Sequence, residues 1–202
     1  AGRLVFSLDA ETALLFTIGL LHRAWHFDFA LRTLKSFQPP SKPKTLVGLK
    51  FRNPIGLAAG LDNNGVALPA WETLGFGFIE IGTVTAKAQP GNPRPRIFRY
   101  PNEKALINRL GFNNDGAEVV AERLRRLRAS ARPPSIPIGV NLGKSRVTPL
   151  EEAAADYLLS FRPLTPLPSY TPANVPTPAP PRLADGAKPA RTETARNTPF
   201  AQ

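Results

Sequence analysis

The sequence of 202 residues contains no cysteine and no methionine, and its two histidines, His22 and His26, lie close together near the N-terminal end. Without cysteine the chain can form neither disulfides nor thiolate metal sites, and it has no catalytic thiol. Two histidines, distant from the other polar motifs, are too few for a zinc site. We therefore expect no metal site and no cysteine chemistry.

The chain also lacks a long hydrophobic run. Its longest apolar stretch, Ala13–Leu21, is shorter than the ~20 residues that a membrane-spanning helix needs. The acidic residues Asp9 and Glu11 precede this stretch, whereas a signal peptide begins with a basic segment. The sequence therefore predicts neither a spanning helix nor a signal peptide.

Neither of the common phosphate-binding loops, GxGxxG or GxxxxGK[ST], is present. Both loops place backbone N–H groups around phosphate oxygens at the start of a helix. Their absence argues against a Rossmann dinucleotide site and against nucleoside triphosphate binding.

Positive charge is abundant, with a formal net charge of +11. Such a charge suits nucleic acid, a phosphate-bearing cofactor or an anionic membrane, and it does not choose among them. The densest basic run, Arg123–Arg128, keeps Val119, Val120, Leu124 and Leu127 at helical spacing. This pattern favours the solvated face of an amphipathic helix over a nucleic-acid patch, and we expect no nucleic-acid partner.

Proline is concentrated at the C-terminal end. Ten of the forty residues from Pro163 to Gln202 are proline, and aliphatic periodicity is lost there. Such a composition predicts a disordered tail over residues 163–202, after a globular part that ends near Arg162.

The N-terminal forty residues are expected to form a helix pair. Asp9 is a candidate N-cap for a helix over Ala10–Arg23, and a second helix over Phe29–Phe37 would end at Pro39-Pro40. Aromatic and basic residues alternate in this segment, which is typical of helices in a membrane interface. The alternative, that the pair packs on the main domain, remains open.

Residues 45–162 repeat the order strand, loop, helix. After a short strand at Leu46–Phe51, three further strands are predicted at Ile55–Ala59, Phe78–Val84 and Ile136–Leu142. Helices are expected at Gly65–Leu74, at Asp115–Arg128 and from Thr148-Pro149-Leu150-Glu151, which combines a capping box with a proline at the first helical position. This order predicts an α/β fold with a parallel sheet.

The connection Ala86–Asn108 is too long for an ordinary βα loop. Its centre, Gln89–Arg96, is rich in turn-forming and basic residues. Long loops on the ligand face of a βα fold are often functional, although a rigid surface excursion is the alternative.

Small and polar residues stand where the predicted strands end. Ala58-Ala59-Gly60 leaves room for a flat ring system, while Thr83 and Asn141 supply a hydroxyl and an amide for hydrogen bonds at the ring edge. In a parallel βα sheet these ends lie together. The alternative is that the small residues serve packing only.

Several motifs in the same order resemble the N-terminal part of the quinone-linked (class 2) dihydroorotate dehydrogenases. The resemblance covers Asp9 to about Arg162 and is carried by Phe51–Asp62, Gly75–Thr85, Gln89–Asn92, Ile107–Asn113 and Gly139–Lys144. It implies a (β/α)₈ TIM barrel that holds FMN, of which this chain would contain the first three βα units. It also implies that residues 1–40 are a membrane-docking helix pair forming a quinone tunnel.

The resemblance implies a flavin reaction in pyrimidine biosynthesis. In the family, a serine base removes the C5 proton of dihydroorotate, hydride passes from C6 to the flavin, and ubiquinone reoxidises the flavin. The expected partners are dihydroorotate, orotate, ubiquinone and a membrane surface. The expected location is peripheral, on the cytoplasmic face of the bacterial inner membrane or on the mitochondrial inner membrane.

The resemblance also assigns residues. The positions that match the family's FMN contacts are Ala59, Gly60, Leu61, Asp62, Asn63, Thr83 and Asn141. The positions that match its substrate contacts are Asn63, Asn108, Arg109, Leu110, Gly111 and Phe112. The Asn108 amide suits a pyrimidine edge, and Arg109 with nearby backbone amides suits a carboxylate.

Two departures from the family are visible. Asn63 stands where the family has a lysine, which removes a fixed positive charge beside the flavin. After Arg162 the family's Asn-x-Ser-Ser-Pro-Asn-Thr motif, with its serine base, is not recognised, and a frameshift near Arg162 would explain this. We therefore expect an inactive, aggregation-prone part of a barrel that binds FMN weakly or not at all, or, alternatively, a non-catalytic membrane-associated remnant.

Overall fold

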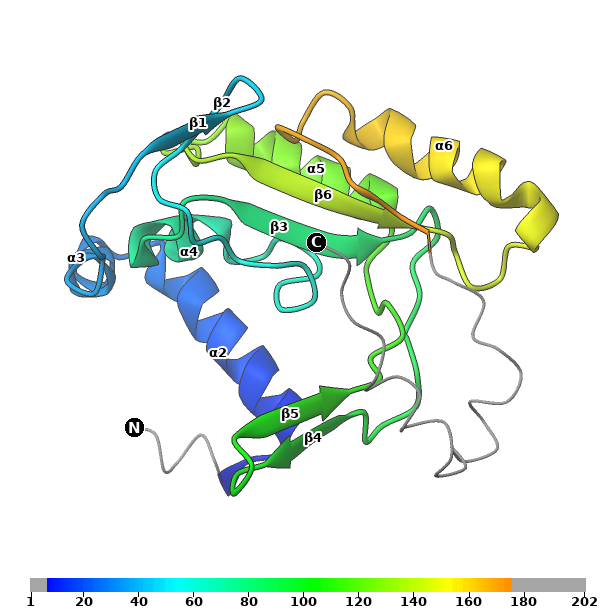
Figure 1. Ribbon diagram of the computed structural model, residues 1–202, viewed down its shortest axis with the longest axis horizontal. Coiled ribbons are helices and arrows are strands. Elements are labelled where there is room, and N and C mark those ends of the chain that lie inside the picture. The colour runs from blue at the N-terminus through cyan, green and yellow to red at the C-terminus, as the bar shows by residue number, and fades with distance from the viewer. Residues whose placement is uncertain (1–6, 176–202) are drawn as a thin grey trace, which may run out of the picture.

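The computed structural model describes residues 7–175 and shows a short parallel sheet with helices packed against it (Figure 1). The sheet has the order β3 (Ile79–Val84), β6 (Ile138–Gly143) and β7 (Ala173–Asn174), with neighbouring strands parallel. Helix α4 (Leu68–Leu74) precedes β3, α5 (Ala117–Arg128) connects β3 to β6, and α6 (Ala153–Leu164) connects β6 to β7. This is the predicted βα arrangement.

The N-terminal helix begins where the sequence predicts. Helix α2 (Ala10–Ala24) is capped by the Asp9 carboxylate, which accepts hydrogen bonds from the backbone N–H groups of Glu11 at 3.1 Å and Thr12 at 3.0 Å. Helix α3 (Asp28–Lys35) starts one residue earlier and ends two residues earlier than expected. In Figure 1, α2 runs from α4 towards a separate hairpin at the bottom of the view.

The single strand expected at Leu46–Phe51 is wrong. The chain forms a hairpin of β1 (Lys44–Leu46) and β2 (Leu49–Phe51), and it turns at Val47-Gly48. Both turn residues have positive φ, 49° and 75°, which is the conformation that a two-residue hairpin turn requires.

The first strand of the predicted barrel is present only as an extended segment. Leu57 donates its N–H to the Phe78 carbonyl at 3.0 Å and accepts from the Glu80 N–H at 2.8 Å, so it lies beside β3 as a single parallel bridge. The prediction of a regular strand over Ile55–Ala59 is therefore wrong in extent but right in position.

The prediction that disorder begins at Pro163 is wrong for residues 163–175, and the rest of that tail lies outside the described residues. Helix α6 includes Pro163 and ends with Leu164, whose side chain is fully buried. The chain then returns along β6, where Val140 and Leu142 donate to the carbonyls of Tyr170 and Pro172. Prolines are tolerated here because this segment forms the outer edge of the described sheet, where a missing donor costs little.

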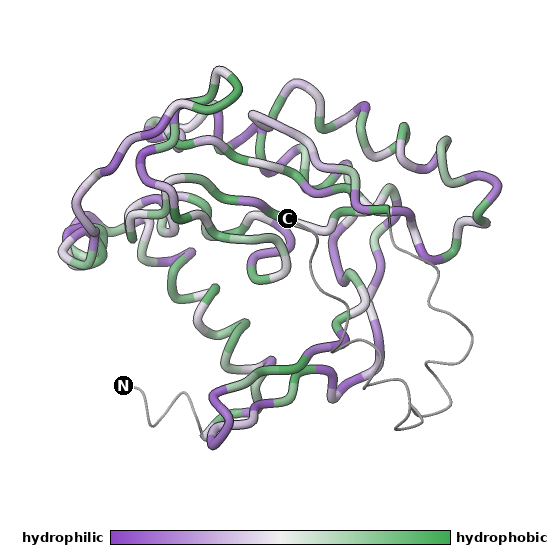
Figure 2. The backbone as a smooth tube through the Cα atoms, in the orientation of Figure 1, coloured by the Kyte–Doolittle hydropathy of each residue, from purple (hydrophilic) through white to green (hydrophobic). Residues whose placement is uncertain are grey.

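The core lies between the sheet and its helices. Buried residues of β3 and β6 contact buried residues of the helices, and Figure 2 shows the hydrophobic residues along both strands; the core cluster includes Ile79, Ile81, Val84, Ile138, Val140, Leu142, Leu68, Trp71, Val120, Leu124 and Leu164. Helix α5 is amphipathic as predicted, except that Val119 is half exposed and Ala117 and Ala121 are buried instead. Alanine positions on a helix are hard to assign to a face from hydrophobicity alone.

The long connection Ala86–Asn108 contains a second hairpin that the sequence analysis missed. Strands β4 (Ile97–Tyr100) and β5 (Ala105–Asn108) pair antiparallel. The turn-rich Gln89–Arg96 stretch before β4 is irregular, as its composition indicates.

The predicted capping box at Thr148–Glu151 does not form. Residues Leu150–Glu152 make a 3₁₀ turn, η1, without a side-chain cap. Thr148 instead donates its hydroxyl to Asp156 Oδ1 at 2.7 Å, and Asp156 Oδ2 accepts from the Ser145 N–H at 2.7 Å. A buried carboxylate on the following helix thus replaces the local cap.

Candidate functional site

The ends of neighbouring strands meet as expected. The Gly60 N–H donates to the Gly82 carbonyl at 2.9 Å, which ties the end of the first extended segment to β3. A side-chain carbon placed on Gly60 would meet no atom within 4 Å, so the space beside this strand end is open. Ala58 and Gly60 are exposed to that space, and Ala59 is half buried.

Thr83, Asn141 and Asn174 form a polar cluster at the ends of β3, β6 and β7. The Thr83 hydroxyl donates to Asn141 Oδ1 at 2.8 Å and accepts from Asn174 Nδ2 at 3.3 Å. Asn141 Nδ2 in turn donates to Glu80 Oε1 at 3.1 Å. Three adjacent strands therefore contribute one continuous chain of hydrogen bonds.

The Glu80 carboxylate fixes the direction of that chain. An ionised carboxylate can only accept, so Asn141 must present its NH₂ group to Glu80 and its oxygen to Thr83. Thr83 then donates to Asn141 and can accept from Asn174. One charged residue on β3 thus determines how the amides beside the open space are oriented.

Tyr170, in the segment that leads into β7, lies close to Glu80. Burial, and after it the nearby Glu80 carboxylate, raises the pKa of Tyr170 to about 12, so the phenol is neutral at physiological pH. Gly139, which pairs with Glu80 on β3 and bridges to Tyr170, makes this contact possible. A side-chain carbon on Gly139 would overlap the Tyr170 ring.

A Gly139→Ala substitution is expected to displace Tyr170 and to lower the free energy of unfolding by about 1–3 kcal/mol, the usual range for overpacking. Urea unfolding followed by circular dichroism measures this change. Gly19→Ala is the matched control, because a side-chain carbon on Gly19 meets only the flexible end of Arg23 at 3.6 Å. Equal stability of both variants would contradict the assigned contact.

Asn63 lies beside the residue that follows the segment Asn108–Phe112. We call this segment the substrate loop, after the substrate contacts that the sequence analysis predicts for it. Asn63 Nδ2 donates to the Asn113 carbonyl at 2.9 Å and approaches Asn113 Oδ1 at 3.3 Å. Asn63 Oδ1 is buried and, among residues 7–175, has no hydrogen-bond partner. A buried acceptor without a partner is costly and marks a place where a ligand donor would be stabilised.

The Asp62 carboxylate makes its hydrogen bonds within the protein, and its assignment as a cofactor contact stays a prediction. Its side chain is only 2% exposed. The carboxylate accepts from the N–H groups of Val66 and Ala67 at 2.8 Å and from the Trp71 indole at 3.1 Å. All of these bonds order the loop that leads into α4, so the Asp62 carboxylate has a structural role.

The second half of the substrate loop is tied to the strand ends. Gln89 Nε2 donates to the carbonyls of Gly111 at 3.2 Å and Phe112 at 3.1 Å. Asn114, which follows the loop, exchanges two side-chain hydrogen bonds with Thr85 at the end of β3. Gly111 and Phe112 both have positive φ, 75° and 56°, so the backbone turns sharply here.

The first half of the loop lies on the β4–β5 hairpin. Asn108 is exposed at the end of β5. The Arg109 guanidinium donates to the Pro95 carbonyl at 3.2 Å and lies 5.4 Å from the centre of the Phe98 ring. The structure therefore holds Arg109 by protein contacts and shows it bound to the hairpin, which the sequence analysis did not anticipate.

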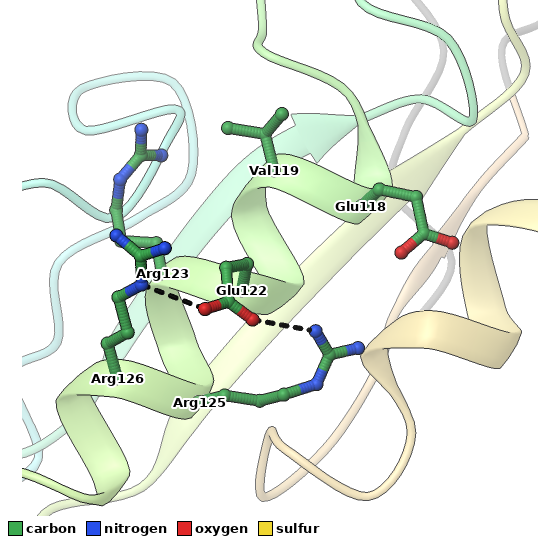
Figure 3. Close-up of a pocket in the computed structure, with 6 residues that line it drawn as sticks. All are labelled: Glu118, Val119, Glu122, Arg123, Arg125 and Arg126. Carbon is green, nitrogen blue, oxygen red and sulfur yellow. Dashed lines mark hydrogen bonds and ion pairs between the residues drawn. The ribbon is translucent and has the colours of Figure 1, made fainter.

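A shallow pocket lies on the outer surface of α5 and contains no residue from the strand ends (Figure 3). It is lined by Glu118, Val119, Glu122, Arg123, Arg125 and Arg126, which all come from one helix. Arg125 and Arg126 contact Glu122, and Arg125 and Arg128 also donate to the carbonyls of Pro163 and Leu167. These arginines thus have partners within the protein, as expected for the solvated face of a helix.

Within residues 7–175, no group of three or more histidine or acidic residues could hold a metal ion. Over the same part of the chain, no helix has the length and apolar character that crossing a membrane requires.

Sequence reasoning missed Asn174, Glu80 and Tyr170. Asn174 was assigned to the disordered tail, although an asparagine two residues after a proline at a strand end gave a weak signal. Glu80 was passed over because a carboxylate within an apolar strand has no recognisable motif. The hydrogen bonds that give these residues a role cross between strands and are visible only in the folded chain.

The sequence and the structure match known proteins. A family model described as dihydroorotate dehydrogenase matches residues 43–195. The dihydroorotate dehydrogenase (quinone) of Chloroflexus aurantiacus is 50% identical to this chain, over 87% of this chain and 48% of its own length. That of Salinispora arenicola is 51% identical, over 88% of this chain and 52% of its own length. The crystal structure of the Eimeria tenella dihydroorotate dehydrogenase in complex with ferulenol is 34% identical with a TM-score of 0.61, over 75% of this chain and 43% of that one.

The chain spans about half the length of the curated relatives it matches. The family match continues to residue 195, well beyond Arg162. The match thus extends beyond Arg162, where the sequence analysis places the departure from the family, and a frameshift in this part of the chain stays a prediction. The polar cluster at the ends of β3, β6 and β7 lies on a partial TIM-barrel-type fold, and the chain belongs to the dihydroorotate dehydrogenase family, in its quinone-linked class.

Proposed function

We propose that this chain takes part in the oxidation of dihydroorotate to orotate, with FMN as cofactor and a quinone as electron acceptor, in pyrimidine biosynthesis. The single observation that carries the proposal is the polar cluster of Thr83, Asn141 and Asn174 beside the open space at Gly60. Its residues stand at the strand ends where a βα barrel binds its ligands.

The residues present fit a flavin. A flat ring can approach the backbone at Ala59 and Gly60, where no side chain fills the space. Thr83, Asn141 and Asn174 would hold the polar edge of the ring, and the unpartnered Asn63 Oδ1 would accept from one of its N–H groups. Bound there, FMN would supply the hydride acceptor that side chains cannot provide.

We assign substrate recognition to the substrate loop and Asn63. The amide of Asn108 can pair with the edge of a pyrimidine, and the backbone N–H groups near Gly111 and Phe112 suit a carboxylate. Because Arg109 is bound to Pro95 and Phe98, it would have to leave the hairpin to contact a ligand. Leu110 would contribute its backbone and an apolar contact.

The proton-abstracting group is proposed from the sequence that follows β7. The segment Asn174-Val175-Pro176-Thr177-Pro178 has an asparagine and a proline at the same spacing as the family's Asn-x-Ser-Ser-Pro motif, and it has neither serine. The family serine base is therefore absent, and Thr177, outside the described residues, carries the one hydroxyl in these five positions. A crowded threonine hydroxyl would act slowly as a base, so we expect weak activity at most.

Orotate formation tests this proposal. The full chain, supplied with FMN, dihydroorotate and a soluble quinone, should produce orotate slowly, as followed by its ultraviolet absorbance. Thr177→Ser should raise the rate and Thr177→Val should abolish it. No orotate from either the parent chain or the serine variant would reject catalysis by this chain.

A membrane-associated role without catalysis is the second candidate, and the surface of the N-terminal helices favours it. Leu15, Phe16 and Leu20 on α2 are each about half exposed, and Phe29 and Phe37 are more than two-thirds exposed. Basic residues accompany these apolar side chains, which suits an anionic bilayer surface. We propose peripheral attachment to the bacterial inner membrane, or to the mitochondrial inner membrane if the source is eukaryotic.

Replacing Phe29 and Phe37 together by serine is expected to reduce binding to anionic vesicles at least about tenfold, because two large apolar side chains would no longer enter the interface. Flotation with vesicles containing phosphatidylglycerol measures this change. Leu158→Ser, an exposed apolar residue on α6, is the matched control. Vesicle binding without any flavin binding would favour the non-catalytic candidate, whereas no vesicle binding by the parent chain would reject both membrane proposals.

A further inference from the structure

A buried ion pair connects the first helix to the loops at the ligand face. Glu11 on α2 is 4% exposed and Arg96, directly before β4, is 6% exposed. Arg96 Nε donates to Glu11 Oε2 at 3.0 Å and Arg96 Nη2 to Glu11 Oε1 at 2.7 Å, which is a two-pronged pair. Arg94 approaches Glu11 Oε1 at 3.0 Å from the surface.

The remaining nitrogen of Arg96 holds the neighbouring loops. Its Nη1 donates to the carbonyls of Pro90 at 2.5 Å and Asn92 at 2.9 Å, and it lies 3.5 Å from the Leu110 carbonyl in the substrate loop. A side-chain carbon on Gly91 would overlap both the Leu110 carbonyl and Arg96, so these groups are closely packed. One guanidinium therefore contacts α2, the Gln89–Asn92 turn and the substrate loop.

The substrate loop depends on that turn for its conformation. Asn92 Nδ2 donates to the Arg109 carbonyl at 2.7 Å, and the Asn92 N–H donates to the Leu110 carbonyl at 2.9 Å. Gln89 holds the carbonyls of Gly111 and Phe112. Four consecutive carbonyls of the loop are thus held by a turn whose own position is set by Arg96.

We propose that Glu11 and Arg96 are positioning residues through which α2 sets the conformation of the substrate loop. Without Glu11, the Arg96 charge would be buried and unpaired, which is unfavourable enough to draw the guanidinium towards solvent and to release the turn. The proposal rests on the proposed function in so far as the loop binds substrate. Because coupling between two sites is reciprocal, substrate bound to the loop would in turn favour the docked position of α2.

The competing interpretation is that the ion pair merely stabilises the fold. Arg96 lowers the pKa of Glu11, first by hydrogen bonding and then by its charge, which either interpretation accommodates. The two differ in where the effect of a substitution appears. A positioning role predicts a change confined to the turn and the substrate loop, whereas a stabilising role predicts a change in the core as well.

Hydrogen exchange on the full 202-residue chain separates these interpretations. Glu11→Gln keeps the size of the side chain and removes its charge. Arg96→Lys leaves the sequence of α2 unchanged and removes the guanidinium that forms two hydrogen bonds with Glu11. Asp28→Asn is the matched control, because Asp28 and Arg132 form another ion pair between the N-terminal helices and the body, with both side chains more than half exposed.

In both test variants, amides of residues 89–92 and 108–112 should exchange at least about tenfold faster, while those of β3 and β6 change less than about twofold. The Asp28 variant should leave all of them unchanged. Unaltered exchange in the loop, or an equal increase in β3 and β6, would overturn the proposal.

Calorimetric titration with orotate connects the result to function. Weaker orotate binding by both variants than by the parent chain supports the coupling, and unchanged binding overturns it. If the parent chain binds no orotate, the proposed function fails, while the exchange experiment still decides whether Glu11 and Arg96 position the loop.

Discussion

Replacing Asp62 by alanine is expected to lower the free energy of unfolding by about 3–5 kcal/mol, one of the largest single effects in the described part of the chain. The Asp62 carboxylate accepts three hydrogen bonds, from the N–H groups of Val66 and Ala67 and from the Trp71 indole. Alanine leaves three donors at a buried position without an acceptor, and the loop leading into α4 loses its only side-chain cap of this kind.

Urea unfolding followed by circular dichroism measures the effect of Asp62→Ala. Asp62→Asn should give an intermediate loss, since the amide oxygen can replace one carboxylate oxygen but its NH₂ group cannot accept. Asp115→Ala is the matched control, because Asp115 pairs with Arg123 at a position where both side chains are about one-third exposed, and it should cost less than about 1 kcal/mol. Similar losses for Asp62→Ala and Asp115→Ala would show that Asp62 is not the structural centre of this loop.

Replacing Asn63 by lysine is expected to tighten FMN binding by about ten- to a hundredfold, the range that a charge-assisted hydrogen bond provides. Asn63 stands where the family has lysine, between the strand ends and Asn113. Its Oδ1 is buried without a partner among residues 7–175, so the present side chain is poorly matched to its surroundings. Lysine would lose the hydrogen bond that Asn63 Oδ1 could accept, and its ammonium group would replace that bond with a charge-assisted one to an oxygen of the ring.

Quenching of FMN fluorescence measures this gain. Asn64→Lys is the control for charge alone, since it adds the same charge one residue away, where the Asn64 side chain accepts from the Asp115 N–H. We expect Asn63→Lys to tighten FMN binding and Asn64→Lys to leave it unchanged. Equal gains at both positions would indicate a general electrostatic effect and no specific contact with the flavin.

Much of the fold follows from local sequence patterns. The Asp9 cap is a short-range signal and is found where predicted. The order of strands and helices predicts a parallel sheet, and β3 and β6 pair in parallel. The two misses have different causes. The β4–β5 hairpin pairs residues that are close in sequence, but it lies within a connection whose composition is typical of a loop. The Pro172 segment depends on β6, which lies about thirty residues earlier in the chain, and tertiary packing there overrides a composition that is typical of disorder.

The candidate site could be predicted in outline and not in detail. Gly60, Thr83 and Asn141 converge because strand ends in a parallel sheet lie together, which is a property of the architecture. The intramolecular contacts of Asp62 and Arg109 could not be predicted, because a carboxylate or guanidinium beside a site has the same sequence signature whether it binds a ligand or orders a loop. Only the hydrogen-bond partners distinguish these two roles.

The central claim is that the strand-end cluster forms a flavin site, and one titration tests it most directly. FMN is titrated into the parent chain, into Asn141→Ala and into Thr83→Val, with fluorescence quenching as the readout. The account predicts weak but saturable binding by the parent chain that is lost in both variants. Absence of saturable binding, or binding that is unchanged without the Asn141 amide and the Thr83 hydroxyl, would contradict it.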